Sequence, residues 1–211
     1  CLSSLLNILI QIVIGLLKVI EMTTYNIASE YPVIVGEYPF HKQLKEELVP
    51  LLENHRDEMG KRTNVKATMT NYHWGLDTKS KRLQRFQDCI LAEAQNHKNY
   101  SDLTVASPHL PALFVKDFWA NIYYKGDYAQ SHDHTEFLMG FSFAYFLKSN
   151  WYHSPFIFTD SGKKIKPKEG TYVLFPSHMR HHVPKNRFNE TRITLSGNIL
   201  TVYREDIIKQ P

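Results

Sequence analysis

The chain has 211 residues, of which 43% are hydrophobic, 13% aromatic and 22% charged. This composition belongs to a folded globular protein with a sizeable core, and it excludes disordered and fibrous proteins. The formal net charge is +4, and the basic residues form short clusters typical of solvated surface, so nucleic-acid binding has no strong support.

The first 21 residues form an apolar segment that differs from the rest of the chain. Its hydrophobic run, Leu5 to Ile20, is shorter than the roughly 20 residues that a membrane span needs. We interpret residues 1–21 either as translated sequence upstream of a start at Met22 or as an amphipathic helix. Membrane contact is therefore expected only if this segment belongs to the mature protein. The two cysteines, Cys1 and Cys89, cannot form a disulfide framework, so we expect a cytoplasmic protein.

Two amphipathic helices are predicted in the part of the chain that follows, residues 22–110. Apolar residues recur at helical spacing at Phe40, Leu44, Leu48, Leu51 and Leu52 in the first helix and at Leu83, Phe86, Ile90 and Ala94 in the second. Pro50 should bend or interrupt the first helix, and Thr78 is a candidate N-cap of the second. We expect the two helices to form a supporting layer.

From residue 111 the chain changes to short β-branched and aromatic runs. These are "LFVKDFWANIYY", "GFSFAYFL", "PFIFTD", "GTYVLFP" and "RITLSGNILTVY", with turn residues between them. Many short strands at close spacing predict an antiparallel sandwich or barrel of the jelly-roll kind. We therefore expect a mostly β fold with supporting helices (α+β), in one domain from residue 22 to 211 with its β core at residues 111–204.

Metal-binding residue types gather in "SHDHTEF", residues 131–137. On a strand, residues two apart share a face, so His132 and His134 could both point into a barrel, with His134 and Glu136 as the competing pair. Either pair needs a third ligand from elsewhere. Three candidates follow a strand end in "GTYVLFPSHMRHHVPKN": His178, His181 and His182.

Strand alternation in "RITLSGN" puts polar residues on the inner face of the barrel. Arg192, Thr194 and Ser196 share one face, and Ile193 and Leu195 share the other. A buried arginine is costly unless it meets an anion, and a carboxylate is its natural partner. Tyr123, nine residues before His132, could add a hydroxyl or be an ordinary core aromatic residue.

Taken in order, the runs "WANIYYKGDYAQSHDH", "FSFAYFL", "GTYVLFPSHMRHHVPKN" and "TRITLSGNI" resemble the Fe(II)/2-oxoglutarate-dependent dioxygenases. The similarity is to the prolyl-4-hydroxylase-like branch, and within it to oxygenases of marine tailed phages. It extends from Trp119 to Ile199. It implies a double-stranded β-helix with one iron at its open end and, if a phage encodes the chain, a location in the host cytoplasm.

The resemblance also implies a set of site residues. It selects His132, His134 and His181 as iron ligands, and it selects Tyr123, Arg192 and Thr194 to bind 2-oxoglutarate. The family usually has an acidic residue where this chain has His134. Asp133 or Glu136 could supply the missing charge from beside the metal, or Glu136 could itself be the ligand in a shifted register.

The implied activity is hydroxylation of an unidentified small-molecule or peptide substrate, with release of succinate and CO2. The implied cofactors are Fe(II) and the cosubstrate 2-oxoglutarate, with ascorbate as an accessory. Three alternatives stay open: a cupin-type metal-binding protein, a dioxygenase that does not use 2-oxoglutarate, and a catalytically inactive barrel. A nucleic-acid repair oxygenase would carry a second arginine where this chain has Asn198.

Overall fold

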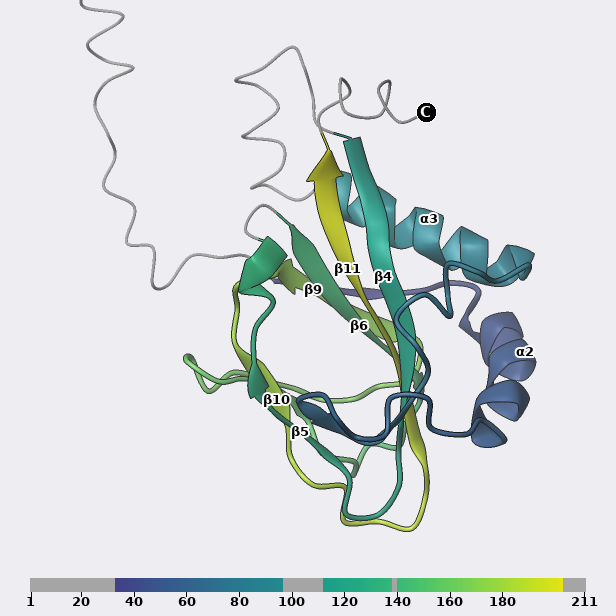
Figure 1. The fold of residues 1–211 in the computed structure, drawn as a ribbon, viewed down its shortest axis with the longest axis vertical. Helices are drawn as coiled ribbons and strands as arrows, with labels where there is room; N and C mark the ends of the chain where they lie inside the picture. The colour runs from purple at the N-terminus through teal and green to yellow at the C-terminus, as the bar shows by residue number, and fades with distance from the viewer. Residues whose placement is uncertain (1–32, 97–111, 138–139, 203–211) are drawn as a thin grey trace, which may run out of the picture. The chain divides into compact units, whose positions relative to one another are not determined.

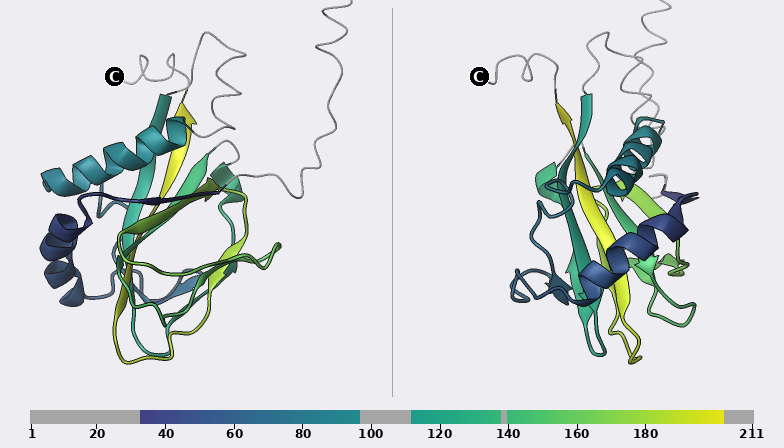
Figure 2. Two further views of the ribbon diagram at one scale, coloured as in Figure 1. Left: turned by 180° about the vertical axis from the view of Figure 1, so that it is seen from behind. Right: turned by 90° about the vertical axis from the view of Figure 1, so that its right-hand side faces the viewer.

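The computed structural model describes residues 33–96, 112–137 and 140–202. Two antiparallel sheets face each other, and two helices cover the outer side of the larger one (Figure 1 and Figure 2). The predicted mostly β class with supporting helices is therefore confirmed. Residues 1–21 lie outside the described part, and the predicted domain boundaries stay predictions. Within the described residues, no helix is long and apolar enough to cross a bilayer.

The larger sheet has six strands in the order β1-β9-β6-β11-β4-β3. They are β1 (Ile34–Glu37), β3 (Thr68–Met69), β4 (Ala112–Tyr123), β6 (Phe141–Lys148), β9 (Thr171–Pro176) and β11 (Arg192–Val202). The smaller sheet has the order β2-β5-β10-β7-β8. Its strands are β2 (Val65–Lys66), β5 (Tyr128–His132), β7 (Phe156–Phe158), β8 (Lys164–Ile165) and β10 (His181–Val183).

All five strand runs expected from the sequence form strands, namely β4, β6, β7, β9 and β11. Several of the others have only two to four residues, which is too short for a clear alternating pattern. The part of the chain before residue 97 was expected to supply helices. It also supplies β1, β2 and β3 to the two sheets.

Alternation along β11 gives this strand an apolar outer face and a polar inner face. Ile193 and Leu195 belong to the apolar core that also contains the helix residues. Arg192, in contrast, pairs directly with Tyr123 across the β11–β4 ladder. The predicted division of this strand into two faces is confirmed.

The helices are α2 (His41–Glu53) and α3 (Lys81–Gln95). Their buried residues are Leu44, Leu48 and Leu52 in α2 and Leu83, Phe86, Ile90 and Ala94 in α3. The expectation that Phe40 and Leu51 share the buried face was wrong, because they are 53% and 63% exposed. The buried side of α2 consists only of residues spaced four apart, namely Leu44, Leu48 and Leu52. Pro50 lies inside α2, which continues to Glu53.

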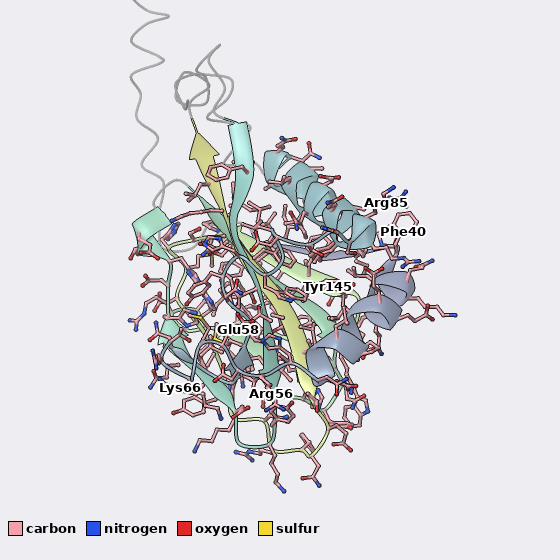
Figure 3. The ribbon with its side chains drawn as sticks, turned by 45° about the vertical axis from the view of Figure 1, so that its right-hand side comes forward. Phe40, Arg56, Glu58, Lys66, Arg85 and Tyr145 are labelled. Carbon is pink, nitrogen blue, oxygen red and sulfur yellow. The ribbon has the colours of Figure 1, made fainter. Side chains whose placement is uncertain are left out.

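Tyr145 of β6 packs between the larger sheet and the two helices. Its ring packs against Phe86 of α3 with 4.4 Å between centroids. Its hydroxyl lies 2.7 Å from Nδ1 of His41 at the start of α2. Figure 3 labels Tyr145 and shows its side chain between the larger sheet and the two helices. One side chain of the sheet therefore contacts both helices.

The N-cap of α3 differs from the predicted one. Ser80, not Thr78, caps the helix, with its hydroxyl accepting a hydrogen bond from Leu83 N at 3.1 Å. Thr78 instead accepts a bond from Ser80 N. Replacing Ser80 with alanine should lower the free energy of unfolding by about 1 kcal/mol, the usual cost of a lost cap. Urea denaturation should show a smaller loss for Thr78→Ala, and an equal or larger one would contradict this assignment.

Candidate functional site

Three of the predicted histidines meet where the smaller sheet ends. His132 is the last residue of β5, and it pairs across the ladder with His181, the first residue of β10. His134 lies beyond the strand, so the expectation that strand alternation aligns it with His132 was wrong. The loop itself positions it: His134 N donates to Ser177 O at 2.8 Å.

The chain makes a tight turn between His132 and His134. Asp133 Oδ1 accepts a hydrogen bond from Thr135 N at 3.1 Å, the pattern of an Asx turn. A short 3-10 helix, η1 (Thr135–Phe137), follows at once. Asp133 therefore closes the turn that separates His132 from His134.

The candidate ligand atoms of His132, His134 and His181 all lie within 4.8 Å of one another. Ligand atoms this close together could hold one metal ion. Glu136 is exposed on η1 and is not part of this cluster. His182, an earlier candidate for the third ligand, bonds Thr159 Oγ1 through Nδ1 at 3.0 Å instead. His178 is also outside the cluster.

Backbone carbonyls fix the tautomers of two of these rings. Nδ1 of His132 lies 2.7 Å from Gln130 O, and Nδ1 of His181 lies 2.9 Å from Met179 O. A carbonyl only accepts, so in the neutral ring the proton is on Nδ1 and the lone pair is on Nε2. Both rings thus present Nε2 as a metal-binding atom, held by a partner on the other nitrogen.

Burial keeps the three rings neutral. Desolvation and, as a smaller cause, the neighbouring His132 lower the pKa of His134 to about 4. Desolvation is also the main cause that lowers the pKa of His132 and, more strongly, that of His181. A neutral imidazole is the form that binds Fe(II), so the cluster does not need to lose protons at neutral pH.

Arg192 lies in a cavity whose lining also includes all three histidines. Its side chain is 1% exposed. Nη1 donates to Ser154 O, but Nε and Nη2 find no hydrogen-bond partner among the described residues. Burial lowers the pKa of Arg192 to about 10. A buried cation with two unused donors is costly, and an anionic ligand would relieve that cost.

Two other predicted residues surround the guanidinium. The ring of Tyr123 lies 5.4 Å from it, and burial raises the pKa of the Tyr123 hydroxyl to about 12. Thr194 lies beside the same hydroxyl and lowers its pKa. Both line the cavity with Arg192. The structure therefore brings all six predicted site residues to one cavity.

Sequence reasoning missed part of the cavity lining. Trp119 Nε1 donates to Asn121 Oδ1 at 3.0 Å, and Asn121 Nδ2 donates to Ser196 Oγ at 3.1 Å. All three line the cavity, and of these only Ser196 was placed on the inner face from the sequence. Trp119 and Asn121 stand four and two residues before Tyr123 on β4, so the alternation that was applied to β11 would have found them.

A family-level comparison matches part of the chain. Residues 158–198 match the model of the family described as "Putative 2OG-Fe(II) oxygenase". The matched stretch contains His181, Arg192 and Thr194. No curated protein matches the chain.

Solved structures of three proteins are similar to most of the chain. The viral collagen prolyl hydroxylase of Paramecium bursaria Chlorella virus-1, in complex with 2-oxoglutarate, has 12% identity over 82% of this chain and 97% of its own, with a TM-score of 0.58. A Pseudomonas putida prolyl-4-hydroxylase has 15% identity over 83% and 95%, with a TM-score of 0.57. HygX of Streptomyces hygroscopicus, with nickel and 2-oxoglutarate bound, has 11% identity over 82% and 84%, with a TM-score of 0.60. These similarities confirm the predicted double-stranded β-helix.

Proposed function

We propose that this chain is an Fe(II)- and 2-oxoglutarate-dependent oxygenase, and we propose a ligand set and a reaction for it. The match of residues 158–198 to the family and the similarity of the fold support this proposal. The proposed iron ligands are Nε2 of His132, Nε2 of His181 and a ring nitrogen of His134. The convergence of these three neutral rings beside a buried arginine is the observation that carries the proposal.

The chain's donor set suits the metal. Neutral imidazoles bind Fe(II), and the carbonyls of Gln130 and Met179 hold two of the rings in the tautomer that the metal needs. No carboxylate belongs to the cluster among the described residues. The ligand set therefore leaves the charge of a bound Fe(II) uncompensated, which should favour an anionic cosubstrate at the remaining positions.

Arg192 is proposed to hold the carboxylate of 2-oxoglutarate that lies far from the metal. Nε and Nη2 are adjacent donors on one guanidinium, so they can bond both oxygens of a carboxylate. Tyr123 supplies a hydroxyl group from the neighbouring strand β4, and Thr194 supplies one from β11, the strand of Arg192. Arg192 and the three histidines line the same cavity, so the two ends of the cosubstrate would set its orientation.

Aromatic side chains limit the access of water to the cluster. Phe156 stacks on His181 with 5.0 Å between centroids, and Phe175 meets the same ring edge-on at 4.9 Å. These contacts also prevent the His181 ring from turning away. The protein's work in this scheme is to orient the rings and the cosubstrate and to keep bulk solvent out.

When bound, iron and 2-oxoglutarate supply oxidation of a C–H bond by O2: one oxygen atom enters the substrate as hydroxyl, the other enters succinate, and CO2 is released. The substrate is a small molecule or a peptide. Ascorbate is proposed only as an accessory reductant in the assay.

The reaction is tested by following 2-oxoglutarate in air with Fe(II). We expect formation of succinate that requires Fe(II), 2-oxoglutarate and O2, at a slow basal rate without the substrate. A variant with His181 replaced by alanine should lose this turnover, whereas Asp160→Asn, at an exposed turn, should keep it. Failure of wild-type protein with measured bound iron to form any succinate would favour the cupin or the inactive barrel.

A further inference from the structure

A second cavity lies beside the histidine cluster. Its volume is about 280 Å³. It shares four lining residues with the cavity of Arg192, namely Val65, Trp119, His132 and His134. A ligand in this second cavity would therefore contact two of the three proposed iron ligands. The volume suits a small organic molecule or a single long side chain.

Part of the second cavity is lined by apolar and aromatic groups. Tyr72 and Trp119 meet edge to face with 5.1 Å between ring centroids. Val65 and Met69 also line it and belong to the apolar core between the sheets. Such a surface can bury an aliphatic chain, and the Met69 thioether can adapt to its shape.

The lining of the second cavity also carries acidic residues. Among the described lining residues, Asp117, Asp133 and Glu136 carry carboxylates, and Lys116 is the single lysine or arginine. Asp117 is held in place by Asn198, whose Nδ2 donates to Oδ2 at 2.9 Å. Burial raises the pKa of Tyr72, and Asp117 and Glu136 raise it further. Asp117 and Glu136 line the same cavity as Tyr72.

The two cavities have opposite electrostatic character. Arg192 and a bound metal would make the first cavity attractive to a dianion such as 2-oxoglutarate, and two of its buried donors await a ligand. The carboxylates of the second cavity would repel the same dianion and attract a cation. Arg192 therefore favours the anionic cosubstrate in the first cavity, and the carboxylates favour a cation in the second.

We propose that the second cavity binds the substrate as an organic cation, an amine or guanidine on an aliphatic chain. This inference rests on the proposed function. The cationic group meets Asp117 and Glu136, and the chain lies along Tyr72 and Trp119, which presents its C–H bonds beside His134. The cation could be a free amine or the side chain of a basic residue in a peptide.

The first test compares three probes of one length, hexylamine, hexan-1-ol and hexanoate, with protein that holds Fe(II) and 2-oxoglutarate in the absence of O2. Isothermal titration calorimetry should show hexylamine binding about tenfold more tightly than hexanol, with the preference falling as salt is added. Fe(II) should broaden the NMR signals of the bound amine's methylene protons. No binding of hexylamine, or equal binding of hexanol or hexanoate, would overturn the proposal.

Variants then test which residues give the preference. Asp117→Asn and Glu136→Gln should each weaken hexylamine binding severalfold and leave hexanol binding unchanged. Asp77→Asn removes a carboxylate that is exposed and does not line the cavity, so it should bind hexylamine like wild type. If both cavity variants keep the full preference for the amine, the cation binds elsewhere and the proposal is wrong.

The same samples separate this proposal from the proposed function. Binding of 2-oxoglutarate without any preference for amines would contradict the proposal that the second cavity binds a cation, and it would leave the proposed function intact. Amine binding without 2-oxoglutarate binding would support the cavity and contradict the reaction. Comparing hexylamine with lysine blocked at both backbone ends distinguishes a free amine from a peptide side chain, and tighter binding of either one supports a cationic substrate.

Discussion

The Arg192→Met protein should bind 2-oxoglutarate on the order of 100-fold more weakly than wild type. The reason is the loss of two charge-assisted hydrogen bonds. Each contributes about 1.5–3 kcal/mol, so together they contribute about 3 kcal/mol or more. Iron binding should change little, since Arg192 is not a proposed ligand. Calorimetric titration of 2-oxoglutarate into Fe(II)-loaded protein without O2 measures the affinity. Arg192→Lys should fall between the two, because an ammonium keeps the charge but not the two adjacent donors.

The same substitution should raise the stability of the protein without ligands. Burial lowers the pKa of Arg192 from its model-peptide range to about 10, so the charge costs the folded state about 3 kcal/mol. The stacking on Tyr123 and Phe146 and the bond to Ser154 O offset part of that cost. We expect a net gain of about 1 kcal/mol in the free energy of unfolding. Unchanged 2-oxoglutarate affinity together with a loss of stability would mean that Arg192 is structural.

The second large effect is expected at His134, where the family usually has an acidic residue. His134→Ala should weaken Fe(II) binding more than about 100-fold, since even the loss of a partner behind a ligand costs 10- to 100-fold. The turn that carries His134 is held by backbone and Asp133 hydrogen bonds, so the fold should survive. Anaerobic calorimetry with Fe(II), supported by metal analysis of the purified protein, measures this loss.

Glu136→Ala is the matched control for the iron site. Glu136 lies two residues from His134, is exposed and is not among the clustered ligand atoms. Its removal should leave Fe(II) affinity within about twofold of wild type, because a surface charge that is not a ligand contributes little. Iron loss in Glu136→Ala with retention in His134→Ala would show that the shifted register, with Glu136 as the ligand, is correct.

Long or strongly alternating elements could be predicted from the sequence. The inner face of β11, with Arg192 and Thr194, follows from a period of two, and the buried row of α3 follows from helical spacing. The same spacing failed at Leu51, because the width of a buried face depends on the partner that covers it. That partner is Tyr145 and its neighbours on a distant strand, which local periodicity does not reveal.

The six residues proposed for the site from the sequence line one cavity, but the reason for this geometry was not predicted. His132 and His134 were expected on one strand, whereas β5 ends at His132 and a long-range bond to Ser177 positions His134. The acidic cavity was not predicted. Its wall combines Tyr72 with Asp117 and Glu136, and only the folded sheets bring such distant segments together.

The central claim is that 2-oxoglutarate spans from a metal on three imidazoles to Arg192 in a single cavity. Its most direct test is the visible spectrum of the full chain with Fe(II), recorded without O2 while 2-oxoglutarate is added. We expect a weak charge-transfer band that saturates at one equivalent of cosubstrate per iron and that needs far more cosubstrate in Arg192→Met. Bound iron that gives no such band, or a band unaffected by the loss of Arg192, would contradict this account.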